Sequence, residues 1–151
     1  MNRVTLCVID MQPYFIGCDS DTTSRVVDLV QRAIQRQMGI VVLEYSGCGG
    51  TSERICNLLR HYRKAAFVTK AKNDGSTEFI ETCDFYGFST SKIFVCGVFT
   101  EYCVAQTVRG LRTKLPYSRI AVVLKATNGA NPGAAVDWAS RFREQQVKVV
   151  V

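Results

Sequence analysis

The chain has 151 residues, of which 47% are hydrophobic and 21% are charged, values that are ordinary for a soluble globular domain. No apolar run is long enough to span a membrane, and no cationic and apolar leader precedes the strand-like sequence that begins at Arg3. We therefore expect neither a signal peptide nor a membrane partner. The formal net charge of +6 is scattered along the chain, so we interpret it as a solvated surface rather than a nucleic-acid site.

The seven cysteines are an odd number and include no C-x-x-C pair, a pattern that argues against zinc-ribbon and thioredoxin-type sites. Without a secretion signal, this cysteine usage favours a reduced protein of the cytoplasm. The single histidine, His61, lies beside the inner face of a predicted helix. We interpret His61 as a surface or helix-end residue rather than a ligand or a base.

Apolar strands and amphipathic helices alternate along the first half of the chain. Val4–Ile9 is typical of a buried strand, and it ends at Asp10. Polar residues at 19–24 supply N-cap candidates for a helix that we expect to end at Gly39. The elements that follow are a strand at 40–43, a glycine-rich loop at 47–50, a helix that starts at 51 or 52, and a strand at 65–69 that runs into Lys70.

The second half continues the alternation. We expect a helix over 77–86, a strand that starts at 93, a helix that follows Thr100, and a strand over 119–124. Asn131 and Pro132 are typical of a helix N-cap and first helical position, which predicts a helix that ends near 145. The last predicted strand is 147–151.

This order of elements predicts the fold. Near-continuous apolar strands belong in a parallel sheet that is covered on both faces. With right-handed crossovers, the pattern predicts a three-layer, doubly wound, Rossmann-like α/β domain with a mostly parallel six-stranded sheet. No linker or internal repeat interrupts it, so we expect a single domain over residues 1–151.

The segment 93–104 carries the clearest chemical signal. Gly97 breaks its apolar strand, and Thr100 is a good N-cap for the helix that follows. Cys103 would then lie in the first turn, where the helix dipole and unpaired N–H groups favour a thiolate over a thiol. Cys103 is therefore a candidate nucleophile, the alternative being a small buried apolar residue.

Three reactive side chains are expected at one edge of this sheet. Asp10, Lys70 and Cys103 each follow a different predicted strand, and ligands bind outside the carboxyl ends of strands in such folds. A carboxylate can accept a thiol proton, and an ammonium can keep that carboxylate ionised and stabilise the thiolate. The placement predicts an activated nucleophile with a base and an orienting charge.

Three motifs resemble the isochorismatase-like cysteine hydrolases, a family that includes nicotinamidase and N-carbamoylsarcosine amidase. They are Val8-Ile9-Asp10-Met11-Gln12 with Phe15, Phe67-Val68-Thr69-Lys70 with Phe79, and Gly97-Val98-Phe99-Thr100-Glu101-Tyr102-Cys103-Val104 with Thr107. The resemblance covers nearly the whole chain. It implies Asp10 as base, Lys70 as its partner and Cys103 as nucleophile. Lys72 is the other candidate lysine, and we favour Lys70 because it ends its strand directly.

The resemblance has further implications for the site and the assembly. It implies a cis peptide bond between Val98 and Phe99, which would aim the N–H groups of Phe99 and Cys103 at a developing oxyanion. It also implies a homo-oligomer. Aromatic side chains near these positions are candidates for the wall of an apolar substrate pocket, namely Tyr14, Phe15, Tyr45, Phe99 and Tyr102.

The chain departs from the nicotinamidases of this family at their Asp-His-His metal site. The corresponding stretch, 45–50, contains no histidine, and His61 is the only one in the chain. We therefore expect no metal and no other cofactor, and no nicotinamidase activity.

Together these features predict a metal-independent cysteine hydrolase that cleaves a small amide-type C–N substrate through a thioester. An alternative is a non-catalytic domain on the same fold that binds a small molecule or has a regulatory role. A third hypothesis is a redox-active thiol protein in which Cys103 pairs with a neighbouring cysteine, although no C-x-x-C motif supports it. The sequence leaves the substrate open.

Overall fold

The computed structural model describes residues 3–151. Its centre is a six-stranded sheet in the order β3-β2-β1-β4-β5-β6, and neighbouring strands are parallel throughout. The strands are β1 (Val4–Ile9), β2 (Gly39–Tyr45), β3 (Ala65–Lys70), β4 (Lys92–Val98), β5 (Arg119–Asn128) and β6 (Lys148–Val150). The strand order reverses between β1 and β4, which makes this the switch point where such sheets bind ligands.

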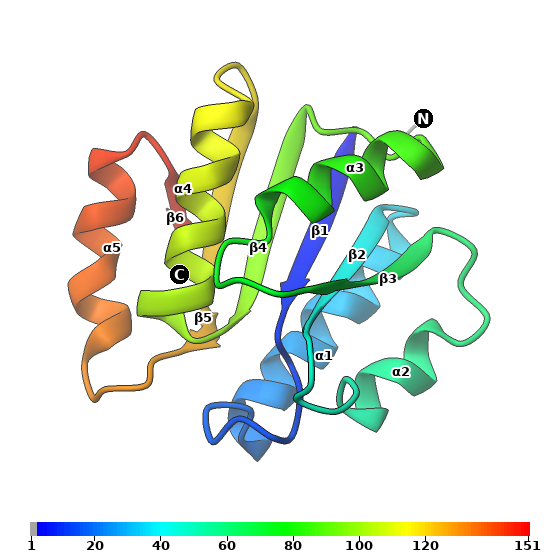
Figure 1. Cartoon of the computed structure of the whole chain (residues 1–151), viewed down its shortest axis with the longest axis horizontal. Coiled ribbons are helices and arrows are strands. Elements are labelled where there is room, and N and C mark those ends of the chain that lie inside the picture. The colour runs from blue at the N-terminus through cyan, green and yellow to red at the C-terminus, as the bar shows by residue number, and fades with distance from the viewer. Residues whose placement is uncertain (1–2) are drawn as a thin grey trace.

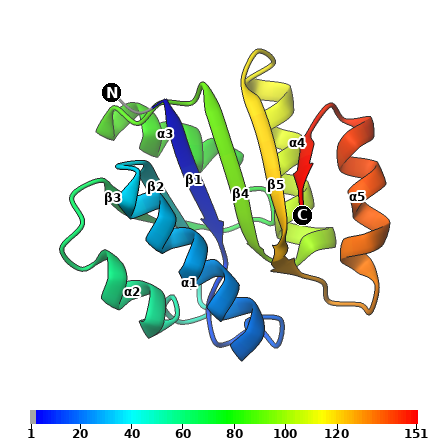
Figure 2. The ribbon, with the colours of Figure 1, turned by 180° about the vertical axis from the view of Figure 1, so that it is seen from behind.

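Helices cover both faces of the sheet, as the alternation predicted (Figures 1 and 2). One face carries α1 (Ser20–Gln35) and α2 (Glu53–Leu59), and the other carries α3 (Ser76–Tyr86), α4 (Ala105–Lys114) and α5 (Ala134–Glu144). A π-helical turn, η1 (Thr100–Val104), joins β4 to α4. Within residues 3–151, no helix combines the length and the apolar character needed to cross a membrane. The predicted three-layer α/β class is confirmed, with a sheet that is wholly parallel.

The core consists of two apolar clusters, one on each face of the sheet. Successive residues of a strand point to opposite faces, so Cys7 of β1 joins the cluster beneath α3, α4 and α5, while Leu6 joins the one beneath α1. Every residue of β1 after Val4 is buried. A central strand that is covered on both faces fixes the position of Asp10, the residue directly after it.

Two predicted boundaries in the second half were wrong. The strand β5 continues to Asn128, and its register with β4 shifts between Val95 and Gly97. The helix α5 begins at Ala134 after Gly133, whose φ is 79°, and the Asn131 amide makes no capping hydrogen bond but donates to Glu101. Two differences are smaller. The C-cap of α1 is Arg36 rather than Gly39, and β6 is Lys148–Val150 rather than 147–151.

Candidate active site

Asp10 follows the central strand and is only 1% exposed. Its φ of 52° is in the left-handed region, which Asp adopts more readily than most residues. Its N–H donates to Leu43 O of β2 at 3.0 Å. The carboxylate accepts no hydrogen bond from a backbone N–H among the described residues, so its lone pairs are available to a proton donor.

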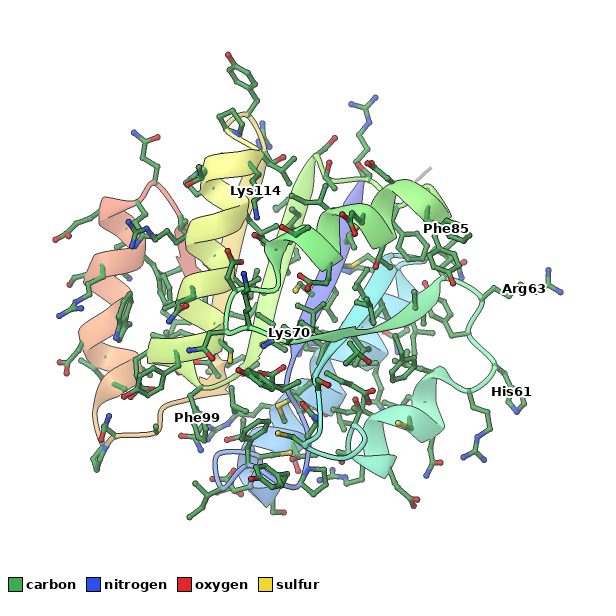
Figure 3. All side chains as sticks on the ribbon, viewed as in Figure 1. His61, Arg63, Lys70, Phe85, Phe99 and Lys114 are labelled. Atoms are coloured by element: carbon green, nitrogen blue, oxygen red, sulfur yellow. The ribbon has the colours of Figure 1, made fainter. Side chains whose placement is uncertain are left out.

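Lys70 lies beside this carboxylate, as predicted, and is also 1% exposed. Its Nζ is 3.1 Å from Asp10 Oδ2 and donates to Lys72 O at 2.9 Å and to Asn73 O at 3.4 Å. The Tyr45 ring centroid is 4.3 Å from the same nitrogen. Figure 3 shows Lys70 in the middle of the molecule, whereas His61 projects from its edge. The Lys72 side chain is exposed, so the structure places Lys70, and not Lys72, against Asp10.

Cys103 completes this group of side chains. Its Sγ is 3.4 Å from Lys70 Nζ and 3.7 Å from Asn73 Oδ1, and the residue is 6% exposed. The thiol therefore lies within reach of an ammonium that is itself paired with a carboxylate. The structure brings Asp10, Lys70 and Cys103 together at the carboxyl edge of the sheet, where the sequence predicted them.

The turn that carries Cys103 differs from the predicted helix start. It is a π-helical turn, and Phe99 O accepts from the N–H groups of Tyr102 at 3.1 Å and Val104 at 3.2 Å. Thr100 is the first residue of this turn and makes no capping hydrogen bond; its hydroxyl donates to Thr127 Oγ1 at 2.9 Å. The prediction of Thr100 as a helix N-cap was therefore wrong: Phe99 occupies the N-cap position, and no side chain caps the turn.

The end of β4 requires a glycine. Gly97 has a φ of 119°, and a Cβ at this position would collide with the backbone of Ile9 in β1. A larger residue would therefore push the two central strands apart, and with them Asp10 and Cys103. One residue further along, the peptide bond between Val98 and Phe99 is cis, as the family resemblance implied.

The pKa values of Cys103 and Asp10 differ from what the helix-start position of Cys103 predicted. Burial, together with the negative charge of Asp10, raises the pKa of the Cys103 thiol to about 12. Burial also raises the pKa of the Asp10 carboxyl, although the Lys70 charge opposes this shift. The predicted preference for a thiolate was therefore wrong: the resting cysteine is a thiol beside a carboxylate of increased basicity.

Aromatic side chains form part of the predicted wall. Phe15 makes edge contacts with Tyr45 and Phe99, with ring centroids 6.4 Å and 5.8 Å apart. Tyr14 contacts Phe15 but is largely exposed. Tyr102 is 45% exposed, and no ring contact joins it to this cluster within residues 3–151. The structure thus groups Phe15, Tyr45 and Phe99, and it leaves Tyr102 apart.

Sequence reasoning missed two polar side chains that fix the loops around the site. Gln12 is buried and bridges to β2: its side chain donates to Tyr45 O and Gly49 O and accepts from Tyr45 N–H. Glu101 accepts from the N–H groups of Ala130 and Asn131 at 2.8 Å and 3.1 Å. Gln12 and Glu101 occur in the first and third of the family motifs given above, and that was the only signal for them in the sequence.

The residues after β2 do not fit the metal site of the nicotinamidases. Residues 45–50 provide no imidazole, and His61 is exposed near the end of α2. No group of three or more His, Cys, Asp or Glu side chains with metal-binding geometry occurs in residues 3–151. The described residues therefore do not form the metal site of the nicotinamidases.

Comparison with known proteins places the chain in a family. The model of the isochorismatase domain matches residues 4–151. The chain belongs to the isochorismatase family. No curated protein matches it.

Solved structures confirm the fold. The Staphylococcus aureus nicotinamidase SaPncA superposes with a TM-score of 0.82 at 16% identity, over 99% of each chain. The Thermoplasma acidophilum N-carbamoylsarcosine amidase superposes with a TM-score of 0.78 at 16% identity, over 99% of this chain and 96% of the other. The Escherichia coli YcaC gene product, described as an octameric hydrolase of unknown specificity, gives 0.81 at 14% identity, over 99% and 75%. At 14–16% identity these superpositions support the predicted fold over nearly the whole chain.

Proposed function

We propose that the protein hydrolyses a C–N bond of a small amide-type substrate, with Cys103 as nucleophile, Asp10 as proton carrier and Lys70 as the partner of Asp10. The observation that carries this proposal is the buried chain of contacts from Asp10 Oδ2 through Lys70 Nζ to Cys103 Sγ, at 3.1 Å and 3.4 Å. A nucleophile, a base and an orienting charge within contact distance are what acyl transfer requires.

The first half of the reaction forms a thioester. Sγ attacks the substrate carbonyl carbon while its proton moves to Asp10, which the raised pKa of that carboxyl favours. We assign the backbone N–H groups of Phe99 and Cys103 to the oxyanion that develops. The C–N bond then breaks, the amine leaves with the proton from Asp10, and an acyl group remains on Sγ.

The second half restores the thiol. Water gives a proton to Asp10 and attacks the thioester carbonyl, the S–C bond breaks, and the proton returns to the sulfur as the carboxylic acid departs. Two backbone carbonyls and the Asp10 carboxylate surround the Lys70 ammonium and hold it beside the sulfur. This positive charge stabilises the transient thiolate. The cluster of Phe15, Tyr45 and Phe99 supplies an apolar wall. The half-exposed Tyr102, which lies apart from this cluster, remains a further candidate for substrate contact.

The decisive experiment is ammonia release from a panel of small primary amides and N-carbamoyl compounds, with the full chain and the variant Cys103→Ala. We expect turnover of at least one compound by the wild type and none by the variant. The matched control is Cys56→Ala on α2, whose half-buried thiol lies outside the site. Saturable binding without product by the wild type would instead establish the non-catalytic alternative.

We further propose that the protein assembles into a homo-oligomer in the cytoplasm. The octameric description of the YcaC neighbour supports self-association. All seven cysteines are free, which suits a reducing compartment. Light scattering coupled to size exclusion tests the first point, since a mass of 16.8 kDa would identify a monomer.

A further inference from the structure

Asn73 is a polar residue beside the nucleophile that no step of the mechanism above uses. Its Oδ1 lies 3.7 Å from Cys103 Sγ and accepts the thiol hydrogen. The residue is half-buried, and no protein donor other than this thiol bonds its Oδ1 within residues 3–151. A fixed carbonyl oxygen therefore faces the position from which Sγ attacks.

The loop that presents Asn73 is held from several sides. The Asn73 carbonyl accepts from Lys70 Nζ at 3.4 Å and from Thr107 Oγ1 at 3.3 Å. The Thr107 hydroxyl in turn accepts from Gly75 N–H at 3.0 Å. A Cβ on Gly75 would come within 2.7 Å of both Leu43 Cδ1 and Lys70 Cδ. The Asn73 backbone is thus tied to the same lysine that pairs with Asp10.

The acceptor on Asn73 loses its donor when the reaction starts. In the resting state the thiol hydrogen occupies Oδ1, but that hydrogen moves to Asp10 as Sγ attacks. A half-buried carbonyl oxygen without a donor is unfavourable. The N–H of an amide substrate is the nearest replacement, because the amide nitrogen is bonded directly to the carbon under attack.

We propose that Asn73 is a substrate-binding residue that accepts the N–H of the scissile amide and so selects amides that carry such a hydrogen. This proposal rests on the function proposed above and goes beyond it in naming the chemical feature that the site recognises. An N–H fixed toward Asn73 turns the nitrogen lone pair away from Oδ1. That lone pair is then free to receive the proton from Asp10, which the departure of the amine requires.

The test uses two isosteric alkylating probes, N-methyliodoacetamide and methyl iodoacetate, which differ by N–H against O. Cys103 modification is followed by peptide mass spectrometry. The rate ratio of the two probes at Cys103 is divided by the ratio at half-buried Cys48 in the same sample, which removes their intrinsic difference in reactivity. We expect a preference of about three- to tenfold for the amide at Cys103, the worth of one hydrogen bond.

Two variants and one control isolate the role of Asn73. In Asn73→Ala the preference should vanish, and in Asn73→Asp it should persist, because a carboxylate oxygen still accepts. Asn57→Ala, on the exposed surface of α2, should keep the wild-type ratio. A wild-type ratio at Cys103 equal to that at Cys48, or a preference that survives in Asn73→Ala, would overturn the proposal.

This measurement is separable from the test of turnover. Alkylation needs no natural substrate, so a preference that depends on Asn73 without hydrolysis would remove the proposed enzyme and keep the amide-binding residue. Hydrolysis that depends on Cys103, without a preference for the amide probe, would keep the proposed enzyme and remove the proposed role of Asn73.

Discussion

Cys96 and Cys103 are buried thiols on the same stretch of chain, yet their surroundings differ. Cys96 lies inside β4 among apolar side chains, and the one hydrogen bond of its thiol within residues 3–151 goes to Cys7 O at 3.7 Å. Cys103 lies one turn beyond the end of β4, in contact with Lys70. Burial raises the pKa of both thiols. What distinguishes Cys103 is the neighbouring pair of Asp10 and Lys70, whose carboxylate can accept a proton.

The comparison shows that an acidic thiol is not the feature that marks this site. A resting thiolate would need a depressed pKa, whereas Cys103 has a raised one. The proposed nucleophile instead has a base at hand, the Asp10 carboxylate, whose own pKa is raised by burial. Reactivity then depends on proton transfer during the attack rather than on a preformed anion.

Removing each thiol in turn is the strongest way to break the comparison. Cys103→Ala should lower the rate of amide hydrolysis by at least about 10⁴-fold, as the loss of a nucleophile does elsewhere. Cys96→Ala should keep that rate and lower the free energy of unfolding by about 1 kcal/mol, because it leaves a small cavity between packed side chains. Steady-state kinetics and urea unfolding of both variants provide the measurement. Equal losses of activity would show that the two surroundings do not matter.

Asp10→Asn separates the acidity of the thiol from catalysis. We expect hydrolysis to fall by about 10²- to 10⁴-fold, the usual contribution of a general base. Alkylation of Cys103 at neutral pH should become faster, because the negative charge that raises the thiol pKa is removed while Lys70 remains. Thermal unfolding of the variant shows whether the fold is retained. Slower alkylation in a folded Asp10→Asn protein would contradict this account of the charges.

The pH dependence sharpens the comparison further. Because the pKa of Cys103 is about 12, its alkylation rate should rise tenfold per pH unit above neutrality, in proportion to the thiolate fraction. Hydrolysis requires an ionised Asp10, so kcat/KM should fall as the pH drops through a pKa above 3.8. A thiol alkylation curve that levels off near neutral pH would mean that a thiolate is already present.

The smallest expected effect is that of the ring beside Lys70. Tyr45→Leu removes the ring that lies 4.3 Å from the ammonium and its edge contact with Phe15. We expect a loss of about 0.5–2 kcal/mol in the free energy of unfolding, the range for a cation–π contact, and a higher KM where the substrate touches this wall. Thermal denaturation and steady-state kinetics measure the two effects. Tyr117→Leu is the matched control, since that ring is 99% exposed and lies outside the cluster.

The sequence alone determined the layers of the fold and the place of the three candidate catalytic residues. Buried strands such as Val4–Ile9 are recognisable because a strand covered on both faces is mostly apolar. Asp10, Lys70 and Cys103 could be assigned to one edge because parallel strands share a direction, so the residues that follow them share an edge. The cis bond at Val98–Phe99 and the choice of Lys70 over Lys72 followed from the motifs and from strand ends.

Only the tertiary structure decided the protonation of the site and the partners of its polar side chains. The local sequence predicts Thr100 and Asn131 as helix caps. In the structure the Thr100 hydroxyl donates to Thr127, and the Asn131 amide donates to Glu101. Asn73 carries no local signal of its contact with Cys103. The thiol pKa depends on burial and on charges from other strands. These properties arise from groups far apart in the chain, and local sequence patterns contain no information about which of them will meet.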